Sequence, residues 1–113
     1  MKNTIYKILR ETEWKNFQSE NIFTGSVHDK RDGFIHMSAN TQLMGTLDKH
    51  YVDIKTIILA QFDAKLLQGV KWEISRGGEK FPHIYGTLTA SALKQYWTLE
   101  AGENSRFTLP KNI

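Results

Sequence analysis

Three short segments of this chain combine polar side chains that can act on a substrate with an apolar, strand-like pattern. They are Asp-Gly-Phe-Ile-His-Met-Ser at 32–38, Trp-Glu-Ile-Ser-Arg-Gly-Gly at 72–78 and Phe-Pro-His-Ile-Tyr-Gly at 81–86. Each segment is bounded by Gly or Pro, which places its polar groups close to strand ends. Imidazole, carboxylate, guanidinium and hydroxyl groups that recur in this way predict one shared pocket.

His36 and Ser38 are the first candidate pair. Side chains two residues apart on a strand point to the same face, so the pair presents a ring N–H and a hydroxyl together. A serine nucleophile activated by His36 is disfavoured, because the chain lacks a Gly-x-Ser-x-Gly elbow. The alternative for His36 is a histidine at the edge of the core that bonds to the backbone.

Glu73 and Arg76 are the charged candidates of the second segment. A carboxylate at position 73 can orient a nucleophile or stabilise an oxocarbenium-like centre as a glycosidic bond breaks. Arg76, followed by Gly77 and Gly78, offers a fork-shaped cation beside exposed backbone N–H groups, which suits a phosphate. The alternatives are an ion pair of Glu73 with Arg76 or Lys71, and a simple Gly-Gly turn.

His83 and Tyr85 alternate onto one face of the third segment, and Ile84 points inward. Phe81 and Pro82 fix the entry to this strand and supply an apolar wall for a flat ring. The alternative is a structural Pro turn with a satisfied Tyr85 hydroxyl.

A metal site is not predicted. His36, His50, His83 and Glu73 lack the four-residue or short-loop spacing of zinc ligands. His28, beside Asp29 in a polar stretch, is assigned to the surface.

The elements that must position these residues follow from the apolar pattern. Strands are expected at 5–9, 34–38, 56–62, 70–74, 83–88 and 93–99, with a further edge strand at 106–109. A first helix begins at the acidic residues Glu11 and Glu13, buries Trp14 and Phe17, and ends near Asn21. The polar segment 27–31 is expected to be a loop.

A second helix is expected to begin at Asn40, a suitable N-cap. Gln42, Thr46 and His50 recur every four residues on one face of this helix. Asp63 caps a short turn over 64–67. The residues of the second helix that face the core are Leu43, Met44, Leu47 and Tyr51. Together these elements predict a compact α+β domain built around a sheet.

Composition limits the function classes. A chain of 113 residues with 40% hydrophobic and 24% charged residues is expected to form a single soluble domain, 1–113, with its core at about 5–99. The absence of cysteine and of a signal-like N-terminus favours a cytoplasmic protein. The net charge of +3 is scattered, so duplex DNA and membranes are not expected partners. No apolar face is left unexplained, which predicts a monomer.

The order of motifs resembles a known family. Ile-Tyr-Lys-Ile-Leu at 5–9, Trp14, Phe-Thr-Gly at 23–25, the 32–38 segment, Gln42, and the 72–78 and 81–86 segments are similar to domain of unknown function 952. This resemblance runs from about residue 5 to residue 97 and implies a fold with only a conjectured activity.

The first half of the chain also resembles the catalytic domain of RNA 2'-phosphotransferases: strand, helix, turn, then an apolar-His-apolar-Ser strand. Residues 57–59, then 62–64 and Leu67 before Gly69, are laid out like the central strand and following turn of those enzymes. The resemblance implies an ADP-ribosyltransferase-like split β-sheet with two main helices, which holds NAD in its cleft.

Two departures from that pattern are visible. Lys7 stands where such enzymes often carry histidine, and Glu73 precedes His83 and Tyr85, against the order His or Arg, Ser or Tyr, Glu.

The resemblance implies an NAD- or ADP-ribose-binding enzyme that transfers a glycosyl or phosphate group. NAD is the expected cofactor and a small nucleotide-like molecule the expected ligand. The alternative is a non-catalytic nucleotide- or protein-binding module with a degenerate cleft. The expected catalytic residues are His36, Ser38, Glu73 and His83, and the expected cofactor-binding residues are Arg76, Gly77, Phe81 and Tyr85.

Overall fold

A computed structural model describes residues 3–113 of the chain, apart from the side chain of Arg76. The elements in those residues are β1 (Thr4–Leu9), α1 (Glu11–Glu20), β2 (Ile22–Phe23), α2 (Val27–Asp32), β3 (Ile35–His36), α3 (Leu43–His50), β4 (Thr56–Asp63), β5 (Val70–Ile74), β6 (Lys80–Ile84), β7 (Leu88–Thr89) and β8 (Leu93–Glu100). Single 3₁₀ turns lie at Asn40–Gln42, Ala64–Leu66, Arg76–Gly78 and Ala90–Ala92. No helix within this described part has the length and apolar character needed to cross a bilayer.

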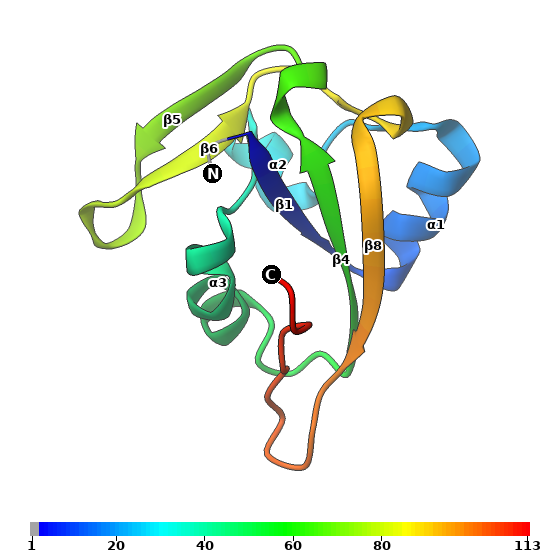
Figure 1. Cartoon of the computed structure of the whole chain (residues 1–113), viewed down its shortest axis with the longest axis vertical. Coiled ribbons are helices and arrows are strands. Elements are labelled where there is room, and N and C mark those ends of the chain that lie inside the picture. The colour runs from blue at the N-terminus through cyan, green and yellow to red at the C-terminus, as the bar shows by residue number, and fades with distance from the viewer. Residues whose placement is uncertain (1–2) are drawn as a thin grey trace.

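The central sheet has the antiparallel order β1-β4-β8 and carries a helix on each face (Figure 1). Ile58 and Phe62 of β4 pack in one core with the α1 residues Trp14 and Phe17. Ile57 and Leu59, on the opposite face of β4, pack in a second core with α3 and with Phe107 of the C-terminal segment. Because both faces are covered, β4 is a nearly continuous apolar run.

A second antiparallel sheet has the order β3-β6-β5, and β2 pairs with β7 in a short ribbon. One isolated bridge links β1 to the end of the β3 segment. There the Tyr6 N–H donates to the Ser38 carbonyl at 2.8 Å, and the Ser38 N–H donates back at 2.9 Å. The register of β3 on β6 places His36 directly opposite His83, so both side chains lie on one face of the second sheet.

The expected α+β class is confirmed, as a mixed domain with antiparallel sheets. The strands at 5–9, 56–62, 70–74 and 93–99 occur within one residue of their expected bounds. Helix α1 ends where expected, because Asn21 adopts a left-handed conformation (φ 62°) and donates to the Phe17 carbonyl. Asp63 accepts a hydrogen bond from the Lys65 N–H and caps its turn as expected.

Several local predictions were wrong. Residues 27–31 belong to helix α2, so the described chain has three α-helices rather than two main ones. Within 34–38 only Ile35–His36 is a strand, and the expected strand 83–88 is divided into the end of β6 and the start of β7. The turn near Gly86 separates these two, since Tyr85 is already bonded back to Gly69.

Two further expectations failed at the helix start and in the tail. Asn40 lies inside a 3₁₀ turn, where its side chain accepts from the Thr41 N–H, and α3 begins at Leu43. Residues 106–109 form no strand, and the Phe107 side chain packs in the second core.

Candidate functional site

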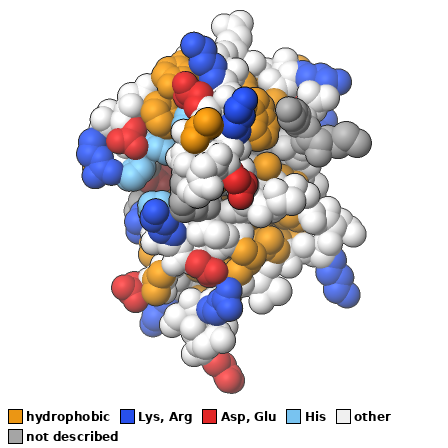
Figure 2. All heavy atoms as spheres, turned by 90° about the vertical axis from the view of Figure 1, so that its left-hand side faces the viewer, with side chains coloured by type: hydrophobic (Ala, Val, Ile, Leu, Met, Phe, Trp, Pro, Cys, Tyr) orange, Lys and Arg blue, Asp and Glu red, His pale blue; other side chains and the backbone are white. Residues whose placement is uncertain are grey.

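All four histidines of the chain lie in one continuous series of ring contacts. The ring centroids of His50 and His28 are 5.6 Å apart, those of His28 and His36 4.5 Å, and those of His36 and His83 5.7 Å. Phe34 contacts two of these rings, stacking on His83 at 4.0 Å and meeting His36 at 4.7 Å. Figure 2 shows histidine side chains at the surface, among acidic and basic side chains. We call these four residues the histidine cluster.

The cluster depends on α2, a helix held by reciprocal capping. The Asp29 N–H donates to Ser26 Oγ at 3.0 Å, and the Ser26 N–H donates to Asp29 Oδ2 at 2.9 Å. Gly33 then ends the helix in a left-handed conformation (φ 87°), which a residue with a side chain rarely adopts. This sharp ending turns the chain back, so that His36 lies beside the helix.

Asp29 is also one half of a buried ion pair with Lys7 of β1. Lys7 Nζ lies 2.9 Å from Asp29 Oδ2 and 3.2 Å from Oδ1, and it donates to the His36 carbonyl at 2.8 Å. Burial by itself raises the pKa of Asp29, but the His36 hydrogen bond and the Lys7 charge outweigh it and hold that pKa well below its usual value. Burial lowers the pKa of the Lys7 ammonium, and the carboxylate offsets part of that effect.

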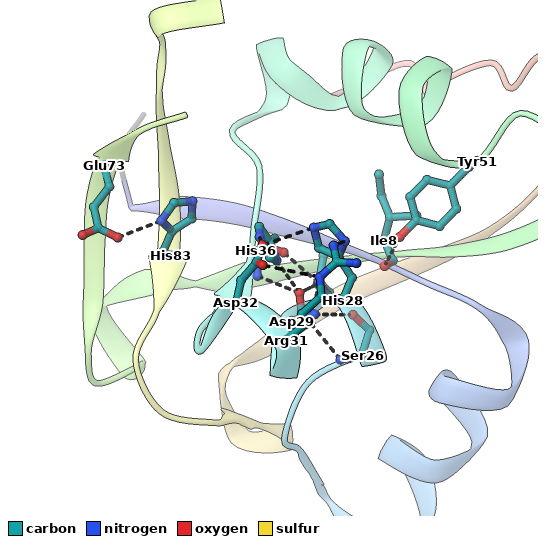
Figure 3. A network of polar contacts seen from close by, with 11 residues as sticks. Ile8, Ser26, His28, Asp29, Arg31, Asp32, His36, Tyr51, Glu73 and His83 are labelled. Atoms are coloured by element: carbon teal, nitrogen blue, oxygen red, sulfur yellow. Dashed lines mark hydrogen bonds and ion pairs between the residues drawn. The ribbon is translucent and has the colours of Figure 1, made fainter. Parts of the chain in front are cut away.

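The ring of His36 is held between two carboxylates (Figure 3). Its Nδ1 lies 2.6 Å from Asp29 Oδ1, and its Nε2 lies 2.9 Å from Asp32 Oδ2. A proton on Nδ1 donates to the buried Asp29, which fixes the ring orientation and directs Nε2 outward. His36 is therefore not a core-edge histidine that bonds only to backbone.

A second carboxylate–histidine contact lies on the neighbouring strands. Glu73 Oε1 is 2.8 Å from His83 Nδ1 and accepts from the Tyr85 hydroxyl at 2.7 Å. In Figure 3 His83 lies between Glu73 and His36. The Tyr85 hydrogen bond, followed by that of His83, lowers the pKa of Glu73, and the same contact raises the pKa of the Tyr85 hydroxyl. Lys71, a suggested ion-pair partner of Glu73, instead places its Nζ 5.3 Å over the Tyr85 ring.

The structure brings four of the eight sequence-derived candidates together. Phe34 contacts His36, His83 and Tyr85. Glu73 joins them through its hydrogen bonds with His83 and Tyr85. Ser38 is buried and its Oγ lies 3.3 Å from Thr46 Oγ1 of α3. Phe81 is a buried residue of β6, and Gly77 lies in the β5–β6 turn with φ 69°. The side chain of Arg76 lies outside the described residues.

A cavity of about 240 Å³ opens beside Phe34. Ligand pockets for drug-sized molecules are usually about 300–1,000 Å³, so this one has room for a single ring and not for a dinucleotide. The lining residues are Thr24, Asp29, Lys30, Gly33, Phe34, Ile35, Ile84 and Gly86.

Sequence reasoning missed Lys7, Asp29, Asp32 and Phe34. The signal that was available is the spacing of His28, Asp32 and His36, four residues apart. This signal was lost because residues 27–31 were assigned to a loop, where a four-residue period has no geometric meaning.

Residues 8–96 match the family model described as "Protein of unknown function (DUF952)". The chain belongs to this family. The DUF952 match includes α2, β3 and the strands that carry Glu73 and His83, so the histidine cluster lies inside the family domain.

Solved structures of one other protein are similar to this chain. The crystal structure of protein CC0527 from Caulobacter crescentus has 36% sequence identity and a TM-score of 0.88, and the match covers 93% of each chain. Its solution NMR structure matches with 36% identity and a TM-score of 0.81 over 92% of this chain and 90% of that one. No curated protein matches the chain.

Proposed function

We propose that this protein binds a nucleotide of the NAD or ADP-ribose class and transfers a glycosyl or phosphate group from it, as an ADP-ribosyltransferase-like enzyme. The proposal rests on one observation. His36 and His83 are cross-strand neighbours with ring centroids 5.7 Å apart, and each has its Nδ1 against a carboxylate. An imidazole anchored through Nδ1 has a fixed Nε2, which hydrogen bonding and proton transfer to a substrate require.

Aromatic rings beside these histidines support a ligand that contains a flat ring. Phe34 stacks on His83 and its centroid lies 5.4 Å from that of Tyr85, which is exposed. A nicotinamide or adenine ring would stack on this surface or enter the cavity beside Phe34. His36 would then lie within reach of ribose hydroxyls.

Glu73 supports the transfer step. A glycosidic bond to nicotinamide breaks through a cationic, oxocarbenium-like transition state, which a nearby carboxylate stabilises. The low pKa of Glu73 keeps this carboxylate ionised at neutral pH. The split between the β1-β4-β8 and β3-β6-β5 sheets, joined at the Tyr6–Ser38 bridge, is compatible with the split sheet of that enzyme class.

The test is a titration with NAD and ADP-ribose, followed by NMR at the rings of the histidine cluster and by calorimetry. We expect shifts centred on His36 and His83, and a roughly two- to tenfold weaker affinity for Tyr85→Ala, because a stacking contact contributes about 0.5–1.5 kcal/mol. Tyr96→Ala is the control, since Tyr96 is an exposed residue of β8 that packs on Trp14.

Release of nicotinamide, measured by chromatography, separates the enzyme from the non-catalytic alternative. Binding without release of nicotinamide and without phosphate transfer would support a nucleotide-binding module. No shift at either histidine with either nucleotide would overturn the nucleotide proposal.

A further inference from the structure

We propose that His28, Asp32 and His36 form a binding site for a divalent transition metal ion, best suited to Zn²⁺. One ligand atom from each residue lies within 4.8 Å of the other two. Asp32 Oδ2 is 3.4 Å from His28 Nε2 and 2.9 Å from His36 Nε2. Tetrahedral Zn²⁺ holds nitrogen and oxygen ligands at about 2.0–2.2 Å, so its ligand atoms lie about 3.3–3.5 Å apart. Small rotations of these three side chains would bring their ligand atoms to that spacing and admit the ion.

The chain supplies this geometry through its four-residue spacing. His28 and Asp32 lie one turn apart on α2 and therefore on one face of it. Gly33 ends the helix and returns the chain, which places His36 of β3 against the same face. Two imidazoles and one carboxylate are a ligand set that binds zinc and related ions and leaves coordination positions open.

Asp29 supplies the outer contact that metal-bound histidines usually have. Its Oδ1 lies 2.6 Å from Nδ1 of His36, and Lys7 and the Ser26 N–H hold the carboxylate in place. A proton on Nδ1 that donates to a buried carboxylate fixes the ring, so that Nε2 is the atom that would bind the metal. In the structure Nε2 donates to Asp32 Oδ2 at 2.9 Å, and an arriving metal ion would replace that proton while Asp29 holds the ring in place.

Arg31 is the element of the site that opposes the metal. Its Nη2 lies 2.7 Å from Nδ1 of His28, so Nδ1 accepts a hydrogen bond and the proton of the neutral ring resides on Nε2. Metal binding through Nε2 requires that proton to move to Nδ1 and Arg31 to turn away. The Arg31 side chain is 69% exposed, so this movement meets little resistance.

The site is open enough to bind a further ligand. His28, Asp32 and His36 are all partly exposed, so water or a phosphate oxygen would complete the coordination. This inference goes beyond the proposed function and shares only His36 with the residues proposed for nucleotide transfer. With the ion bound, His36 Nε2 is a ligand and is no longer available to a nucleotide.

The experiment is a titration of the tag-free, metal-free protein with Zn²⁺ by calorimetry and with Co²⁺ by visible absorption. We expect one ion per chain, and an affinity at least about tenfold weaker for His28→Gln and for Asp32→Asn, because each removes one of three ligands. Both residues are exposed at the surface of α2, and NMR spectra would show that the variants fold. Asp53→Asn, the same change at an exposed residue outside the cluster, should bind as wild type does.

Arg31→Ala should strengthen Zn²⁺ binding, whereas His28→Gln and Asp32→Asn should weaken it. Arg31→Ala removes both the competing hydrogen bond and a repelling positive charge, so affinity for Zn²⁺ should rise severalfold. Absence of a saturable one-to-one complex, or wild-type affinity in both His28→Gln and Asp32→Asn, would overturn the metal site. A Zn²⁺ affinity of Arg31→Ala that equals or falls below that of wild type would contradict the proposal that Arg31 competes with the metal for His28.

The nucleotide titration is repeated with a chelator present. Nucleotide binding that survives the chelator, together with loss of zinc binding in His28→Gln, would show that the two proposals succeed or fail separately.

Discussion

Asp29 is the residue on which most of the polar contacts of the candidate site depend. One carboxylate caps α2, neutralises Lys7 and orients His36, and it also accepts the His36 backbone N–H at 3.1 Å. Sequence reasoning found His36 because an apolar-His-apolar-Ser pattern is visible locally. It missed Asp29 because the partner Lys7 lies 22 residues away, and no local period marks a buried ion pair.

The contact between Tyr85 and Glu73 gives a prediction at the residue scale. In Tyr85→Phe the phenolic hydrogen bond to Glu73 is lost, so the pKa of the Glu73 carboxyl should rise toward its ordinary value. The measurement is a carboxyl-carbon NMR titration of wild type and variant. Tyr96→Phe should leave that titration unchanged, and a Glu73 pKa that stays constant or falls in Tyr85→Phe would contradict the assigned cause.

Helix α2 shows where element assignment from sequence reaches its limit. The helix has six residues, and helices shorter than about 12–15 residues are marginal alone in water. Val27 is 88% exposed and the other side chains of α2 are polar. The sequence therefore has no apolar stripe here that would predict a helix. The strand β4 was predictable because the segment 56–62 is nearly continuously apolar, as expected of a strand covered on both faces. Tertiary contacts, rather than local preference, stabilise α2.

The approach of Gly69 to Tyr85 gives a prediction at the element scale. A Cβ at Gly69 would lie 2.5 Å from the Tyr85 carbonyl oxygen, whereas a Cβ at Gly33 would meet nothing within 4 Å, and φ is positive at both (78° and 87°). Gly33→Ala should therefore lower the free energy of unfolding by about 1–3 kcal/mol through backbone strain alone. Gly69→Ala should lower it by roughly 1–3 kcal/mol more, because two strands must separate.

Urea unfolding of both glycine variants measures this difference. If Gly33→Ala and Gly69→Ala lower the free energy of unfolding equally, the backbone accommodates a Cβ at Gly69 beside Tyr85 without further destabilisation.

At the scale of the whole molecule, the two faces of the central sheet could be predicted and the meeting of the sheets could not. The segment 56–62 was expected to be a strand covered on both sides, and in the neighbouring β1 Ile5 and Leu9 pack in the first core and Tyr6 and Ile8 in the second. The bridge between Tyr6 and Ser38 joins segments 32 residues apart and depends on turns at both ends of α2. Such long-range pairing follows from packing and not from periodicity.

Acid should destabilise the whole domain through Asp29. Its pKa is lower in the folded than in the unfolded state, where it is about 3.9. The stabilisation is therefore fully present above about pH 4 and is lost as the pH falls further toward the folded pKa. Urea unfolding at a series of pH values from 7 to 2 should show this loss.

Lys7→Met tests the cause of that acid sensitivity. It should lower the free energy of unfolding at pH 7 by about 3–5 kcal/mol, because a buried carboxylate is left without its cation. It should also make stability less dependent on pH, since one cause of the low Asp29 pKa is gone. Lys15→Met, at an exposed position of α1, is the control. If the free energy of unfolding falls equally with pH in wild type and Lys7→Met, the Lys7–Asp29 ion pair is not the cause of the acid sensitivity.

The dependence of α2 on Lys7 has a consequence for the order in which the protein folds. The helix is too short to persist alone, and its anchor closes a chain loop from β1, so closure entropy is lost before the ion pair forms. The docking of β1 therefore precedes or accompanies the ordering of residues 26–36. We therefore expect the histidine cluster to be lost in any partly folded form that lacks this docking, and to form together with the native state.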